Sequence, residues 1–164
     1  MYQIIYSLAK ESTIKRILVP IDGSKLARKA LFEAIKIAKK FNSKVFVVTA
    51  VDTSEYPPGM LLALLKKDKR LEESINQFMN SVKTQARKEL FADVSICKSK
   101  GVDANYEIIT GKPVEMILKF ARGRKIDLIV MGSQGLRGMA SIKVLGSVSR
   151  KVSELAPCPV MLIH

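Results

Sequence analysis

Two glycine-containing stretches in the second half of the chain carry residue types that bind phosphate. Residues 132–135 (GSQG) directly follow an apolar run, and residues 146–149 (GSVS) open a helical pattern. Glycines after a strand let the backbone approach a ligand closely. Hydroxyl groups and unpaired backbone N–H groups at a helix N-terminus favour an anion. The stretches therefore predict a phosphate site, although the same residues also fit glycines that only turn the chain and a Ser147 that only caps a helix.

The spacing of these glycines differs from that of two familiar nucleotide-binding loops. The Gly-Lys-Ser/Thr ending of a Walker-type loop is missing, and the glycines do not follow the first strand as in a dinucleotide-binding fingerprint. Arg137 and Lys143 lie between the two stretches and would add charge-assisted contacts to a phosphate.

Asp22, just after the first apolar run, is the carboxylate at the end of the first expected strand. As a ligand residue it would accept a hydrogen bond from a hydroxyl or an amine of the ligand. As a structural residue it would cap the helix that begins near Ser24, and both roles can hold at once. No second general base stands out, because the sole histidine is His164, the last residue. Slow hydrolysis stays open, since phosphoryl transfer depends largely on positioning and metal electrostatics.

The sequence shows no dedicated metal cluster. Cys97 and Cys158 are far apart in the chain and have no His or Cys at ligand spacing, which argues against a zinc site and a disulfide scaffold. Magnesium often binds through substrate phosphates with few protein ligands. We therefore expect Mg²⁺ to arrive with a nucleotide.

Five short apolar runs predict the strands that position these residues. Most are continuous and rich in β-branched residues, as in a parallel sheet covered on both faces, whereas residues 105–109 alternate and fit a strand near the sheet edge. The expected strands are residues 16–21, 45–51, 105–109, 128–131 and 160–163. Helical spacing of apolar residues predicts four helices between them, at 24–41, about 61–100, from 111–113 onward, and about 146–155.

This alternation predicts a single α/β domain with a doubly wound parallel sheet and helices on both faces. Ligands of such open sheets bind beyond the carboxyl ends of the strands, where the strand order reverses. The loops at 22–24, 52–59, 110–112 and 132–145 are therefore the places to look for a site.

The composition agrees with one domain. The 164 residues are expected to divide into an N-terminal extension at 1–13 and a domain at 14–164, and the 48% apolar content excludes a disordered chain. No apolar run reaches the roughly 18 residues of a membrane span, and residues 1–9 lack the features of a secretory signal, so a cytoplasmic location is expected. The net charge of +13 is scattered over the helices. Scattering favours a solvated surface, or a protein of a hot-living organism, over a nucleic-acid-binding face.

Two apolar segments suggest contacts outside the domain core. Residues 56–65 precede the basic stretch 66–70 and fit either a membrane or partner contact or, as we expect, a connection into the second helix. Residues 160–163 would form an apolar edge strand, which invites pairing with another copy.

Three motifs together resemble the universal stress protein family. They are VPIDGS at 19–24, MGSQG at 131–135 followed by GSVS at 146–149, and APCPVMLI at 156–163, so the resemblance spans residues 14–164. It implies a five-stranded parallel sheet with strand order 3-2-1-4-5 and a homodimer through the last strand. Many members bind ATP through Gly-x2-Gly-x9-Gly-Ser/Thr, while another branch lacks this motif and binds no nucleotide.

The resemblance also implies a set of nucleotide-binding residues. Gly132, Gln134, Gly135, Gly146 and Ser147 would form the phosphate and ribose loop, with Val148 and Ser149 beginning the helix, Asp22 near the ribose and adenine, Pro20 shaping its loop, and Val51 and Met131 lining the base pocket. One departure stands out: ten residues, 136–145, separate Gly135 from Gly146 where the motif has nine.

The leading hypothesis is an ATP-binding stress-response protein, with Mg²⁺ on the nucleotide, that acts as a nucleotide-dependent sensor or switch with little or no catalysis. One alternative is a slow ATPase. The other is a nucleotide-free dimer that binds proteins or nucleic acid.

Overall fold

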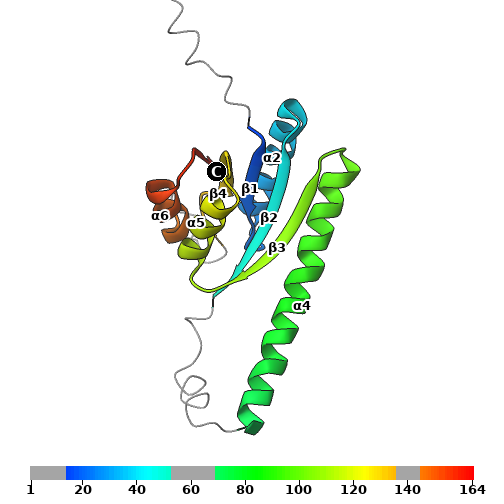
Figure 1. Ribbon diagram of the computed structural model, residues 1–164, viewed down its shortest axis with the longest axis vertical. Helices are drawn as coiled ribbons and strands as arrows, with labels where there is room; N and C mark the ends of the chain where they lie inside the picture. The colour runs from blue at the N-terminus through cyan, green and yellow to red at the C-terminus, as the bar shows by residue number, and fades with distance from the viewer. Residues whose placement is uncertain (1–13, 53–68, 136–144) are drawn as a thin grey trace, which may run out of the picture.

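The computed structural model describes residues 14–52, 69–135 and 145–164. Its centre is a parallel sheet in which the strands lie in the order β3-β2-β1-β4-β5 (Figure 1). The strands are β1 (Arg16–Pro20), β2 (Lys44–Val51), β3 (Ala104–Thr110), β4 (Leu128–Gly132) and β5 (Val160–Ile163). This order confirms the predicted fold, including the edge positions of β3 and β5.

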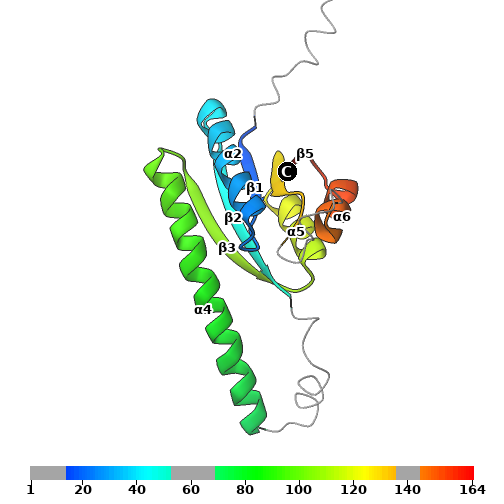
Figure 2. The same ribbon diagram turned by 180° about the vertical axis from the view of Figure 1, so that it is seen from behind.

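The helices cover both faces of the sheet. They are α2 (Lys25–Phe41), α4 (Lys69–Ser99), α5 (Pro113–Gly123) and α6 (Ser147–Leu155). In Figures 1 and 2, α2 and α4 lie on one side of the sheet, and α5 and α6 on the other. The two cores follow the period-2 geometry of β1: Ile17 and Val19 pack with α2 and α4, whereas Leu18 packs with α5 and α6.

Local signals fix the helix ends near the strand ends. Ser24 is the N-cap of α2, and its Oγ accepts a 3.1 Å hydrogen bond from the backbone N–H of Ala27. Pro113 occupies the first turn of α5, where no N–H is needed. Gly146 is the N-cap of α6. These starts agree with the predicted ones to within a residue or two.

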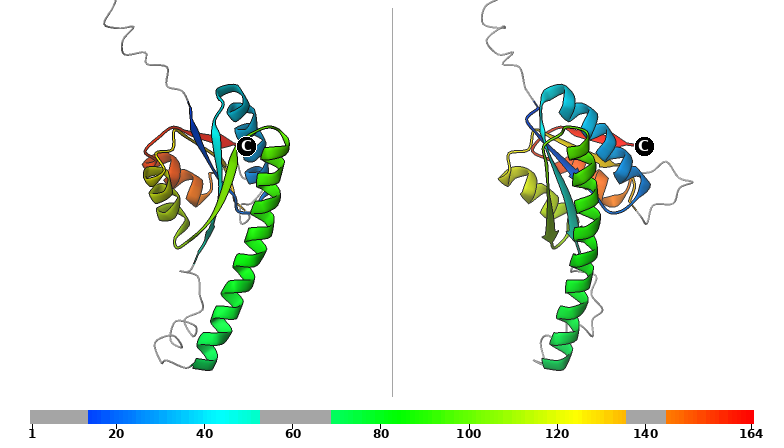
Figure 3. Two further views of the ribbon diagram at one scale, coloured as in Figure 1. Left: turned by 45° about the vertical axis from the view of Figure 1, so that its right-hand side comes forward. Right: turned by 90° about the vertical axis from the view of Figure 1, so that its right-hand side faces the viewer.

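Helix α4 extends well past the sheet (Figure 3). Its 31 residues span about 46 Å at 1.5 Å per residue, whereas the eight residues of β2 span about 26 Å. Leu90, Val94 and Cys97, near its C-terminal end, join the core. Phe78, in the N-terminal half of the helix, is 55% exposed.

Several expectations fall outside the described residues. These are the N-terminal extension at 1–13, the start of the second helix at 61–68, and the apolar and basic segment at 56–68. Within the described ranges, no helix combines the length and the apolar character that crossing a membrane requires.

Candidate functional site

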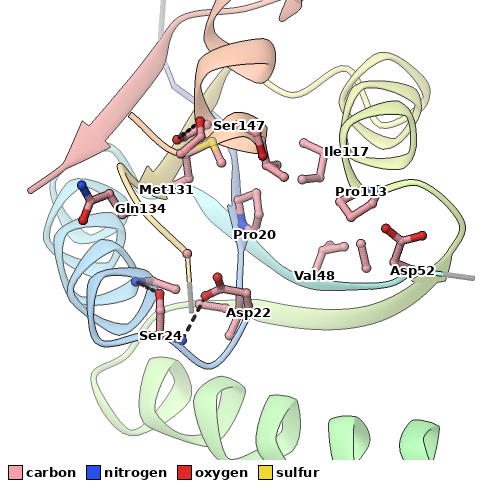
Figure 4. A pocket seen from close by; sticks show the side chains of 18 residues that line it. Pro20, Asp22, Ser24, Val48, Asp52, Pro113, Ile117, Met131, Gln134 and Ser147 are labelled. Atoms are coloured by element: carbon pink, nitrogen blue, oxygen red, sulfur yellow. Dashed lines mark hydrogen bonds between the residues drawn. The ribbon is translucent and has the colours of Figure 1, made fainter. Parts of the chain in front are cut away.

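A cavity of about 510 Å³ lies where the strand order reverses, between the carboxyl ends of β1 and β4. Cavities of this size accept small-molecule ligands, and open α/β sheets bind ligands at this place. Figure 4 shows the side chains around it. Its described lining comprises Pro20, Ile21, Asp22, Ser24, Ala27, Val48, Ala50, Asp52, Pro113, Ile117, Met131, Gly132, Gln134, Gly135, Gly146, Ser147, Val148 and Ser149.

One wall of the cavity is apolar. Pro20 and Met131 come from the carboxyl ends of β1 and β4, Val48 comes from β2, and Ile117 comes from α5. These side chains form a surface suited to a flat ring. The strand β1 end is held in place because the Ile21 N–H donates to the Val48 carbonyl at 2.8 Å.

Val51, expected in the base pocket, does not line the cavity. Alternate residues of a strand point to opposite faces, and on β2 the cavity side is taken by Val48 and Ala50. Val51 instead ends the strand one residue later, where its carbonyl accepts a 3.0 Å hydrogen bond from the N–H of Gly111. The prediction of Val51 as a lining residue is therefore off by one position.

The two glycine turns, residues 132–135 after β4 and residues 146–149 at the start of α6, lie side by side. The N–H of Gly146 donates to the carbonyl oxygen of Ser133 at 2.8 Å, and the hydroxyl of Ser149 donates to the same oxygen at 2.6 Å. Ser133 is anchored in turn, because its N–H donates to the carbonyl of Ile163 on β5 at 2.8 Å. The start of α6 is thereby fixed beside the end of β4.

These contacts give Ser149 a structural role beside its predicted place in the site. Its hydroxyl is buried at 3% exposure and lies 2.6 Å from the Ser133 oxygen and 3.0 Å from the Gly146 oxygen. A hydroxyl has one hydrogen to donate, and here that hydrogen is directed to the carbonyl oxygens of the two turns, which the hydroxyl holds together. The exposed Ser147 carries the other hydroxyl of the motif.

The start of α6 presents backbone donors to the cavity. The N–H groups of Ser147, Val148 and Ser149 belong to the first turn and have no partner within the helix, whose first intrahelical bond runs from Arg150 N–H to the Gly146 carbonyl at 2.9 Å. The N-cap Gly146 supplies no side-chain cap. The positive end of the helix dipole thus faces the cavity, which suits an anion.

The carboxylate of Asp22 lies close to Gly135, in the glycine turn after β4. Its Oδ1 accepts a 3.0 Å hydrogen bond from the N–H of Ser24, so it supports the cap of α2 without being that cap. A Cβ on Gly135 would lie 2.6 Å from Asp22 Oδ2, so a larger residue there requires the Asp22 carboxylate to shift. The carboxylate lines the cavity, where it was predicted to contact a ligand.

Gly132 allows a close contact between β4 and α2. A Cβ there would lie 2.9 Å from the Cβ of Leu26 and 3.0 Å from the backbone nitrogen of Ala27. The glycine therefore lets the end of β4 pack against the first turn of α2. This packing draws a second helix start, with the buried Ser24, to the same cavity.

Several lining residues were not predicted as site residues. Ile21, Ser24, Ala27, Val48, Ala50, Asp52, Pro113 and Ile117 all contribute to the cavity. Two signals were available: strand periodicity on β2 selects Val48 and Ala50, and Asp52 is the first residue after a strand that ends at the ligand-binding edge. Arg137 and Lys143, expected to contact phosphate, lie outside the described residues, as does most of the ten-residue spacer.

The cysteines take no part in the cavity. Both are free, and burial, together with the charge of Asp93, raises the pKa of Cys97 to about 11. Burial and the charge of Asp127 also raise the pKa of Cys158. In the described ranges, no group of three His, Cys, Asp or Glu residues is placed to hold a metal ion.

Comparison with known proteins gives consistent matches. The sequence profile of the universal stress protein family matches residues 13–164. Universal stress protein MJ0531 of Methanocaldococcus jannaschii is 32% identical over 164 residues, which cover 99% of this chain and 90% of that protein.

Solved structures agree with the sequence matches. The structure of protein MJ0577 of the same organism is 26% identical with a TM-score of 0.78, covering 92% of this chain and 96% of that one. A universal stress protein solved in complex with cAMP is 25% identical with a TM-score of 0.61, covering 93% of this chain and 98% of that one.

Proposed function

The chain belongs to the universal stress protein family, and from that premise we propose that it binds ATP in the cavity between β1 and β4. Binding would make the protein a nucleotide-dependent sensor or switch with little or no catalysis. The nucleotide phosphates would meet the start of α6, and the base would lie against the apolar wall.

The observation that carries this proposal is the convergence of the two glycine turns. The Gly146–Ser133 hydrogen bond of 2.8 Å holds the N–H groups of Ser147 and Val148 next to the turn that ends at Gly135. Several backbone donors at a helix start, facing an open cavity, form a preorganised site for a phosphate group. The cAMP complex of a family member supports a phosphorylated adenine nucleoside as the class of ligand.

A magnesium ion would belong to the nucleotide in this account. The described residues hold no cluster that could coordinate a metal by themselves. Magnesium commonly keeps several water ligands and binds through phosphate oxygens, so it fits a site whose protein ligands are few. Bound in that way, it would neutralise phosphate charge.

The described lining favours binding over catalysis. Its ionisable side chains are Asp22 and Asp52, and the first of these already accepts the N–H of Ser24. Residual hydrolysis would have to depend on Asp22, because it lies next to the glycine turn. Phosphate release from MgATP is therefore expected to stay near background. Metal-dependent turnover that is lost in Asp22→Ala would favour the slow ATPase instead.

A homodimer through β5 is part of the proposal. The strand lies at the sheet edge with Met161 40% exposed, and an apolar edge strand can pair with a second copy.

Mass spectrometry of small molecules released from the purified, heat-denatured protein tests nucleotide binding. We expect an adenine nucleotide in about stoichiometric amount, and much less from Gly135→Val. Protein that is nucleotide-free and gives no binding heat with millimolar MgATP would contradict the proposal and favour a nucleotide-free interaction module.

A further inference from the structure

The cavity has two ends of opposite electrostatic character (Figure 4). Gln134 and Ser147 mark one end, where the first N–H groups of α6 give a positive potential. Asp52 lies on the other side of Pro20, beside Pro113 and Val48. Between the two ends the lining is largely apolar, apart from the carboxylate of Asp22, which accepts the N–H of Ser24.

This polarity decides how a nucleotide would lie. Phosphate groups are attracted by the helix start and repelled by the carboxylate of Asp52, and both effects are strengthened where apolar walls exclude water. The same two effects place the base at the Asp52 end. A purine ring would then lie against Val48 and Ile117, with its edge directed to the carboxylate.

We propose that Asp52 reads the base: its carboxylate accepts a hydrogen bond from the exocyclic amino group of adenine. The inference rests on the proposed function, because it assigns the base end of the same site. It names a specificity residue that neither the glycine motif nor the resemblance indicated, and it predicts which nucleotides the cavity rejects.

The selectivity follows from hydrogen-bond chemistry. An ionised carboxylate is only an acceptor. Adenine offers it an N–H group, whereas hypoxanthine presents a carbonyl oxygen at that position, so two acceptors would face each other. A purine without the amino group offers the carboxylate no N–H group, so the hydrogen bond between Asp52 and the base is not formed.

Calorimetric titration with three triphosphates tests the inference. The ligands are ATP, purine riboside triphosphate, which lacks the amino group, and inosine triphosphate. The proteins are wild type, Asp52→Ala, Asp52→Asn and a control, Asp103→Asn. The Asp103→Asn substitution removes the same charge just before the amino-terminal end of β3, away from the cavity. The Asp103 side chain is 65% exposed there, beside Lys44. Circular dichroism checks that every variant is folded.

Wild type and the control should bind ATP about tenfold more tightly than purine riboside triphosphate, the usual effect of one charged hydrogen bond. In Asp52→Ala the two affinities should agree to within about twofold. Asp52→Asn should improve inosine triphosphate relative to ATP, because an amide N–H can donate to the hypoxanthine carbonyl.

Two results would overturn the inference alone: equal affinity of wild type for ATP and purine riboside triphosphate, or an ATP preference that survives in Asp52→Ala. A wild-type protein that binds none of the three ligands would overturn the proposed function, and the inference with it.

Discussion

The backbone N–H of Gly146 donates a 2.8 Å hydrogen bond to the carbonyl oxygen of Ser133, joining the start of α6 to the turn after β4. Twelve residues of sequence lie between these two positions, of which 136–144 are outside the described part of the chain. The contact is therefore the direct physical link between the two halves of the glycine motif.

Ser149→Ala removes the buried hydroxyl that reinforces the link. Loss of its 2.6 Å hydrogen bond to Ser133 should lower the free energy of unfolding by about 1–2 kcal/mol and ATP affinity by about five- to tenfold. Ser147→Ala is the matched control. Its hydroxyl is exposed and its N–H is kept, so its effect on affinity should stay within about threefold. Equal effects of the two substitutions in calorimetry would contradict the distinction.

Gly135→Ala tests the close approach of the glycine turn to Asp22. The added Cβ would lie 2.6 Å from Asp22 Oδ2, so the carboxylate has to shift, and we expect this to weaken the 3.0 Å hydrogen bond that its Oδ1 accepts from the Ser24 N–H. We expect a stability loss of about 1 kcal/mol and a clear fall in nucleotide affinity. Gly123→Ala is the control, because no atom lies within 4 Å of its added Cβ. Unchanged binding by Gly135→Ala would show that the approach is not needed.

Met161→Arg tests the proposed β5 interface. Met161 is 40% exposed on the edge strand, so a charge there would be buried without a partner in a dimer. Light scattering coupled to size exclusion should give a dimer for wild type and a monomer for the variant. Tyr106→Arg, on the opposite edge strand β3, should leave the dimer intact. A wild-type monomer would contradict the interface.

The carboxyl group of Asp93 should make the free energy of unfolding depend on pH. Burial raises the pKa of this carboxyl, Arg28 opposes the rise and Glu89 adds to it. The folded state then holds the proton more tightly than the unfolded state, so stability falls as pH rises from the unfolded pKa, about 3.9, through the higher folded pKa.

Asp93→Asn should therefore have a higher Tm than wild type at pH 7, and the difference should vanish below about pH 3.9. Glu154→Gln, an exposed carboxylate on α6, is the control and should change little at either pH. A variant that is less stable than wild type at pH 7 would contradict the assignment.

The sequence predicted the sheet because each strand is a short apolar run and each helix has a clear apolar stripe. Strand positions matched to within one or two residues, and the loops that follow strands did contain the cavity. The glycines of the motif were found for the same reason, since they follow β4 directly and open α6.

The features that the sequence did not predict depend on which way a side chain points and on which element it contacts. Val51 was expected from the family resemblance alone, and the continuous apolar run of β2 does not indicate that Val48 and Ala50 are the residues on the cavity side. The hydrogen bond from the Ser149 hydroxyl to Ser133 was not predicted, because it joins residues on different elements that are far apart in the sequence.

The most direct test of the account is an NMR titration of the backbone amides with MgATP. The account predicts saturable shifts that are largest for the amides of Ser147, Val148 and Gly135, with smaller shifts around Val48 and Ala50. Saturable shifts confined to another surface, or none at these amides at millimolar MgATP, would contradict it.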